Sequence, residues 1–147
     1  MSGIEIHTSD ERGIGVESSV SKLLENLDYV TSVRGTKKNG PEDKQKIDLV
    51  VNLDKSKKDL SISEVLVQVK ASTTRVISFK REVRQILNNL SEENVSCEEW
   101  LMRNRMIILV GDVRISRSRK SKWPVSSEEI IDSFESQLQK IDNYQRS

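Results

Sequence analysis

The chain has 147 residues, of which 32% are charged and 4% aromatic, and its formal net charge is +1. This length suffices for one domain with a single core, and the charge excludes a bulk polycation, so any affinity for nucleic acid must come from how the charges are arranged. One cysteine, Cys97, excludes an internal disulfide and a Cys-based zinc site, and the single histidine, His7, argues against zinc chemistry and a His-dependent triad. No apolar run approaches membrane-spanning length and no signal-peptide pattern opens the chain, so we expect an intracellular, cytoplasmic protein with no membrane partner.

The N-terminal region predicts one helix after a flexible start. Residues 1–12 are polar and are expected to be loose, and residues 13–147 are expected to form a single domain. Residues 13–27 predict a helix, because apolar residues recur at spacings of three and four. These residues are Val16, Val20, Leu23, Leu24 and Leu27. Glu17 falls at the edge of this stripe, where a carboxylate is costly without a partner; alternatively, it is a first-turn glutamate that favours the helix dipole.

Three strands are predicted next, at residues 28–33, 47–53 and 60–70. The charged turn at residues 54–59 predicts that the second and third strands form a hairpin. Asp48 stands near the start of the second strand, in an otherwise apolar run where aspartate is depleted. It is either a ligand or an ordinary edge residue.

The stretch Glu64–Lys70 alternates valines with longer or polar residues. Side chains two apart share a face of a strand, so the three valines point into a core. Gln68 and Lys70 then point the other way, side by side at the end of the strand. Such a face is commonly solvated, but an amide beside an ammonium also suits a functional site.

The second half of the chain predicts two long helices around a strand. The first of these two long helices is predicted at residues 78–90. Residues 91–104 are expected to contain a short helix near Trp100, and residues 106–110 a strand buried on both faces. A cap signal precedes a last helix at about residues 128–144. The stripe of the first long helix is Phe79, Val83, Ile86, Leu87 and Leu90, and that of the last is Ile130, Ile131, Phe134, Leu138 and Ile141. The order α-β-β-β-α-β-α predicts an α/β fold, a mixed sheet flanked by helices.

Two segments are rich in basic residues. The first, residues 34–46, also holds turn-forming glycine, asparagine and proline, and the second, residues 113–123, interleaves basic residues with serines. The basic residues are Arg34, Lys37, Lys38, Lys44 and Lys46 in the first segment and Arg114, Arg117, Arg119, Lys120 and Lys122 in the second. Both segments are either solvated loops or phosphate-binding surfaces. Trp123, which closes the second, either anchors a loop or stacks on a base or sugar.

Four residues form a candidate constellation: Glu17, Asp48, Gln68 and Lys70. Two carboxylates and an amide oxygen suit a hard divalent cation such as Mg²⁺. A cation held there polarises a phosphodiester and helps to generate hydroxide from water. Lys70, beside it, is placed to orient the attacking water or to stabilise charge in the transition state.

This arrangement, in the element order given above, resembles the PD-(D/E)XK nuclease superfamily, also called the restriction-endonuclease-like fold. Glu17 matches the helix glutamate of the family pattern, Asp48 the strand aspartate, Gln68 the (D/E) position and Lys70 the lysine. Two departures are Ile47, which stands where the pattern has proline, and Gln68, which replaces a carboxylate as in the Gln-x-Lys variant. The missing negative charge should weaken metal affinity.

The resemblance, which covers residues 13–110, implies a DNA endonuclease that depends on Mg²⁺ or Mn²⁺ and acts in restriction, homing, or junction processing and repair. The metal ligands would be Glu17, Asp48 and Gln68, Lys70 would assist the nucleophile, and the two basic segments would hold duplex or branched DNA. Because members that cut both strands usually pair their active sites, we expect a homodimer or higher oligomer, with the last helix as a candidate interface. The main alternative is a catalytically inactive nucleic-acid-binding or assembly module on the same fold, and a metal-free protein-interaction domain is a third.

Overall fold

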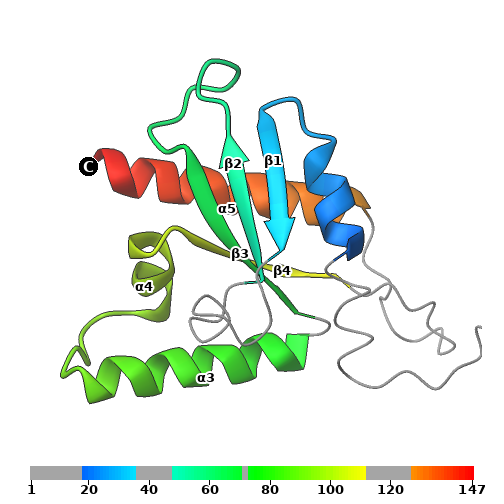
Figure 1. Ribbon diagram of the computed structural model, residues 1–147. Helices are drawn as coiled ribbons and strands as arrows, with labels where there is room; N and C mark the ends of the chain where they lie inside the picture. The colour runs from blue at the N-terminus through cyan, green and yellow to red at the C-terminus, as the bar shows by residue number, and fades with distance from the viewer. Residues whose placement is uncertain (1–17, 36–47, 71–72, 112–126) are drawn as a thin grey trace, which may run out of the picture.

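The computed structural model describes residues 18–35, 48–70, 73–111 and 127–147, and the statements below concern these residues (Figure 1). Residues 18–25 are helical, within the range predicted for the first helix, and are called the N-terminal helix here. The other elements are β1 (Val30–Gly35), β2 (Leu49–Leu53), β3 (Glu64–Lys70), α3 (Thr73–Asn89), α4 (Cys97–Arg103), β4 (Met106–Val110) and α5 (Ser127–Arg146). The order of elements agrees with the predicted order, with α4 as the short helix near Trp100.

The four strands form one mixed sheet in the order β1-β2-β3-β4. The pairs β1–β2 and β2–β3 are antiparallel, whereas β3 and β4 are parallel. The predicted hairpin of the second and third strands is therefore confirmed. Parallel neighbours require a crossover connection, and α3 and α4 supply it between β3 and β4. The chain belongs to the α/β class.

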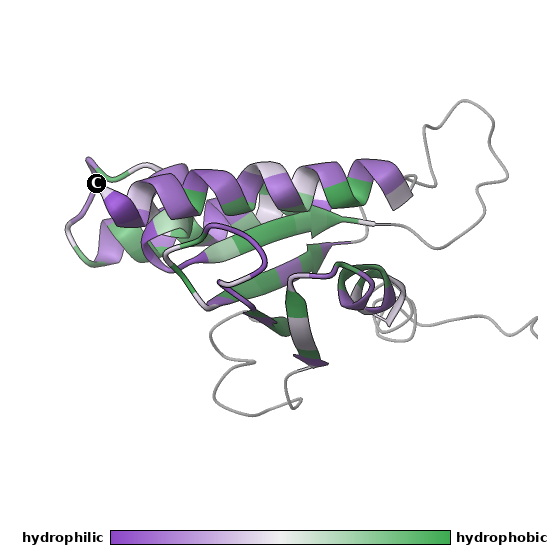
Figure 2. Ribbon diagram, turned by 90° about the horizontal axis from the view of Figure 1, so that it is seen from above, coloured by the Kyte–Doolittle hydropathy of each residue, from purple (hydrophilic) through white to green (hydrophobic). Residues whose placement is uncertain are grey.

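The sheet has helices on both faces, and strands β2, β3 and β4 are mostly buried, whereas most of β1 is exposed. On one face, the valines of β3 pack with the N-terminal helix and α5, and Figure 2 shows α5 lying along the sheet. On the other face, Val50, Met106 and Ile108 pack against Phe79 and other residues of α3, with α4 beside them. This arrangement explains why β4 is apolar throughout.

Element boundaries differ from the prediction where apolar residues lie outside regular strands. β3 begins at Glu64 rather than residue 60, although Leu60 and Ile62 are both 5% exposed. These two side chains join the core from the connection that precedes the strand, so apolar character alone does not mark a strand end. β1 is displaced to Val30–Gly35 from the predicted 28–33.

The α3 stripe was only partly right. Phe79, Val83 and Leu87 are buried, but Ile86 is 38% and Leu90 62% exposed. The helix begins at Thr73, five residues before the predicted start, and its buried side continues through the half-buried Val76 instead. The stripe of α5 is confirmed, with Ile130, Phe134, Leu138 and Ile141 buried and Ile131 packed against them. None of the helices in the described ranges combines the length and apolar composition needed to cross a membrane.

Candidate functional site

The C-terminal end of β3 carries Gln68 and Lys70 on the face opposite the valines. Val65, Val67 and Val69 are buried in the core shared with α5, as the alternation predicted. The Gln68 face is not solvated, because Gln68 is only 5% exposed. Gln68 is therefore a buried polar side chain, which needs hydrogen-bond partners.

Asp48 lies next to Gln68, as the hairpin predicts. It directly precedes β2, and the antiparallel register pairs Leu49 with Val67, so residues 48 and 68 face each other. The backbone N–H of Asp48 donates to the carbonyl of Val67 at 3.0 Å. Its Oδ2 accepts two hydrogen bonds, from the backbone N–H of Val69 at 2.7 Å and from Nε2 of Gln68 at 3.1 Å. The Val69 bond fixes the carboxylate against the strand that carries Gln68.

The oxygen of the Gln68 amide has no hydrogen-bond partner among the described residues. This atom, Oε1, is buried. An unsatisfied buried acceptor costs about 1–3 kcal/mol, and such groups in native proteins call for an explanation. A cation that takes Oε1 as a ligand would give this oxygen a partner.

The donor set fits a hard divalent cation in type. A carboxylate and an amide oxygen are the ligands that Mg²⁺ prefers, with waters completing its shell. Within the described ranges, no three His, Cys, Asp or Glu side chains lie close enough to hold a metal ion together. Asp48 and Gln68 would thus supply two side-chain ligands to such a cation, and the third predicted ligand, Glu17, lies outside the described residues.

Lys70 lies on the same face as Gln68, in register with Val110 of β4. Its Nζ is 5.0 Å from the centroid of the Phe79 ring in α3, within cation–π range. The side chain is half-buried. The ring of Phe79 therefore helps to fix the Lys70 ammonium on the face of the sheet that carries Gln68.

Of the predicted nucleic-acid-binding residues, the structure describes Arg34 alone. The others, Lys37, Lys38, Lys44, Lys46, Arg114, Arg117, Arg119, Lys120 and Lys122, lie outside the described residues, as does Trp123. Arg34 belongs to β1 and not to a loop, and it pairs with Val50 of β2. Because paired residues share a face and side chains alternate, Arg34 and Asp48 lie on the same side of the sheet.

Helix α3 adds basic residues that the sequence reasoning did not assign to a site. It carries four basic residues and one acidic residue, whereas α5, which packs against the opposite face, carries five acidic and two basic. The basic residues of α3 are Arg75, Lys80, Arg81 and Arg84. The adjacent Lys80 and Arg81 in a predicted helix could have indicated a basic helix from the sequence. Only the fold shows that this helix packs on the face of the sheet that carries Gln68 and Lys70.

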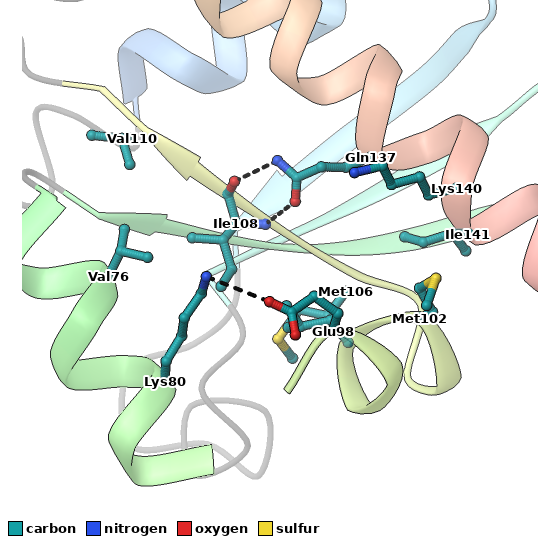
Figure 3. Close-up of a pocket in the computed structure, with 11 residues that line it drawn as sticks. Val76, Lys80, Glu98, Met102, Met106, Ile108, Val110, Gln137, Lys140 and Ile141 are labelled. Atoms are coloured by element: carbon teal, nitrogen blue, oxygen red, sulfur yellow. Dashed lines mark hydrogen bonds and ion pairs between the residues drawn. The ribbon is translucent and has the colours of Figure 1, made fainter. Parts of the chain in front are cut away.

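A cavity of about 530 Å³ lies between α3, α4, β4 and α5 (Figure 3). Its walls are mostly apolar, from residues such as Val76, Met106 and Val110, and the ion pair between Lys80 and Glu98 spans it at 3.9 Å. Asp48, Gln68 and Lys70 are not among the described residues that line it. It is separate from the Asp48–Gln68 pair.

Comparisons of the chain with protein-family models, with curated proteins and with solved structures found no match. The family and the activity are therefore inferred from the residues around Asp48 and Gln68 and from the order of the elements.

Proposed function

We propose that this chain is a Mg²⁺-dependent DNA endonuclease of the PD-(D/E)XK type, with Mn²⁺ as an alternative cation. The observation that carries the proposal is the convergence of Asp48 and Gln68, with the amide Oε1 of Gln68 buried and unpartnered among the described residues. Lys70 on the same face supports it. The order of three antiparallel strands, a helical crossover and a fourth, parallel strand also fits the restriction-endonuclease-like fold.

The protein side chains have separate roles in this proposal. Asp48 and Gln68 would hold the cation, with Glu17 as a third ligand, and the bound cation would polarise the scissile phosphodiester and lower the pKa of a water. Lys70 would orient that water and stabilise negative charge on the phosphate. The bond from the Val69 N–H to Asp48 keeps the carboxylate in place without using the side chain of another ligand.

The charge distribution supports a nucleic-acid substrate. Arg34 and the basic helix α3 lie on the side of the sheet that carries Gln68, and the acidic helix α5 lies on the other. Phosphate contacts from such residues position DNA without reading its sequence. The basic segments at residues 34–46 and 114–122 would add further phosphate contacts, and duplex and branched DNA are both candidate substrates.

The test is cleavage of supercoiled plasmid and of branched DNA by the wild type and the Lys70→Ala variant, with Mg²⁺, with Mn²⁺ and with chelator. We expect metal-dependent cutting by the wild type and a loss of at least about 100-fold in the variant, because charge stabilisation at this position acts on the transition state. DNA binding, measured by fluorescence anisotropy, should be nearly unchanged.

Lys55→Ala is the matched control. Lys55 is exposed in the connection after β2, at the opposite end of the strand from Asp48, so its loss should leave cutting unchanged. Cutting retained by Lys70→Ala would contradict the role of this lysine. Wild-type protein that cuts neither substrate yet binds DNA in a salt-sensitive way would contradict the enzyme assignment.

The second candidate function is a nucleic-acid-binding or assembly module without catalysis. The observation that favours it is the hydrogen bond from Gln68 to Asp48, which satisfies the carboxylate without a cation. Mg²⁺ titration separates the two candidates, because a non-catalytic module predicts no binding that depends on Asp48.

A further inference from the structure

Of the two polar atoms of the Gln68 amide, only Nε2 has a hydrogen-bond partner among the described residues. Nε2 donates to Oδ2 of Asp48 at 3.1 Å, while Oε1 is buried and unpartnered among the described residues. The opposite orientation would place Oε1 against the carboxylate oxygen, and two acceptors repel each other. The carboxylate therefore sets the orientation of the amide when no cation is bound.

A divalent cation reverses this preference. It attracts the amide oxygen and repels the partly positive NH₂ group, so a cation held beside Asp48 favours Oε1 in the place that Nε2 occupies. The terminal torsion of glutamine is broad and roughly two-fold, so the amide can turn without moving the backbone. The bond from the Val69 N–H to the same Asp48 oxygen, at 2.7 Å, can remain throughout.

We propose that Gln68 is a two-position latch on the cation site. Without a cation its Nε2 holds Asp48, and with a divalent cation the amide turns by about 180° and presents Oε1 as a ligand. This inference rests on the proposed function, since it places the cation at Asp48. Because binding must break the Gln68–Asp48 hydrogen bond, the free protein holds the cation weakly.

DNA should then bind cooperatively with the cation. A DNA phosphate supplies further oxygen ligands and negative charge, which compensate for the missing carboxylate at residue 68. Coupling between two ligands is reciprocal, so the cation should also tighten DNA binding. The latch thus makes cation binding at Asp48 and Gln68 depend on the presence of the DNA substrate.

The first experiment follows side-chain amides by NMR in the full-length, ¹⁵N-labelled protein during titration with Mg²⁺, without and with DNA. The Gln68 NH₂ resonances should shift as the bond to Asp48 is lost, while the Val69 amide proton stays protected from solvent exchange. Binding of Mg²⁺ with unchanged Gln68 resonances would overturn the latch and leave the proposed function intact. No response around Asp48, even with DNA, would overturn both.

The second experiment uses Gln68→Glu, which removes the donor and adds a ligand charge. In chelator at pH 8 its Tm should lie below that of the wild type, because two carboxylates then face each other. In saturating Mg²⁺ the order should reverse, and its Kd for Mg²⁺ should fall by about tenfold or more.

Asn52→Asp is the matched control. It makes the same amide-to-carboxylate change on β2, where Asn52 donates to Oγ of Ser32 at 2.8 Å, away from the cation site. Its Tm should respond to Mg²⁺ as the wild type does. A Gln68→Glu variant that equals the wild type in chelator, or binds Mg²⁺ no more tightly, would overturn the latch.

Discussion

Asp142 is a buried carboxylate with a structural role, away from the proposed cation site. It is 2% exposed, and its Oδ1 accepts hydrogen bonds of 2.6 Å from both the backbone N–H and the hydroxyl of Ser61. Its Oδ2 accepts from Nε of Arg146 at 2.9 Å, and Arg146 also pairs with Asp59. The group ties the last turns of α5 to the connection that precedes β3.

The charge of Asp142 makes this tie dependent on pH. Burial alone would raise the pKa of Asp142, but the hydrogen bonds from Ser61 and the guanidinium of Arg146 outweigh it, so the pKa is lowered. A pKa lowered by folding contributes stability above the unfolded value, and that contribution is lost as the pH falls through the folded value. The stability that ionised Asp142 contributes should therefore be lost below about pH 4.

We expect Asp142→Asn to reduce the free energy of unfolding by about 2 kcal/mol at pH 7, because charge-assisted hydrogen bonds are lost. The difference from the wild type should shrink between pH 4 and pH 2, which urea unfolding at each pH would measure. Asp132→Asn, an exposed position on the same helix, should change stability by less than about 0.5 kcal/mol. A difference for Asp142→Asn that stays constant with pH would contradict this account.

Strand β4 is at the edge of the sheet, and a side chain of α5 pairs with its backbone. Oε1 of Gln137 accepts from the N–H of Ile108 at 3.0 Å, and its Nε2 donates to the carbonyl of Ile108 at 2.7 Å (Figure 3). The amide thereby makes both hydrogen bonds that a neighbouring strand would make at this residue. Covering an edge in this way satisfies buried backbone groups and blocks pairing with other chains.

Gln137→Leu should destabilise the protein by about 1–3 kcal/mol, because it keeps the apolar part of the side chain but leaves the N–H and C=O of Ile108 without partners. Chemical denaturation would measure the change. Gln139→Leu is the control on the same helix, since Gln139 is exposed and bonds only to Asn143 among the described residues. Equal effects of the two substitutions would show that the Ile108 contacts contribute nothing.

The sequence predicted the elements that have clear periodicity, and it placed Asp48 and Gln68 on adjacent strands of a hairpin. The register that sets the two residues opposite each other comes from the structure. The prediction misplaced the start of β3, because Leu60 and Ile62 enter the core from an irregular connection. The burial of Gln68 and the unpartnered Oε1 could not be predicted, since they depend on the tertiary packing over this face of the sheet. Periodicity reports which side of a strand a residue faces, but it does not report what covers that side.

At the scale of the whole molecule, the last helix, α5, does not expose its apolar side to a partner chain. Its apolar stripe, the predicted dimer contact, is buried against the sheet of its own chain. The large apolar residues left exposed among the described residues are Ile77, Ile86 and Leu90, in or directly after α3. Ile86 and Leu90 are four residues apart and thus share one side of the helical surface.

We expect a homodimer in solution, because endonucleases of the proposed type that cut both strands of DNA usually pair their active sites. Light scattering at micromolar concentration should give about twice the 16.8 kDa of one chain. If the end of α3 forms the contact, Leu90→Lys should shift the mass towards the monomer, and Lys57→Ala, a change in the exposed connection after β2, should not. A monomeric wild type, with and without DNA, would contradict dimerisation.

The location of the site within the hairpin also bears on how it is assembled during folding. Asp48 and Gln68 are 20 residues apart, whereas the β3–β4 register joins Leu66 to Met106, about twice that separation. Doubling the length of a loop raises the entropic cost of closing it by only about 0.6 kcal/mol, yet pairings between distant residues slow folding most. The two proposed ligands can therefore meet in the local hairpin before β4 docks. Strand β4, which lies in register with Gln68 at Ile108, then joins a pair of residues that already face each other.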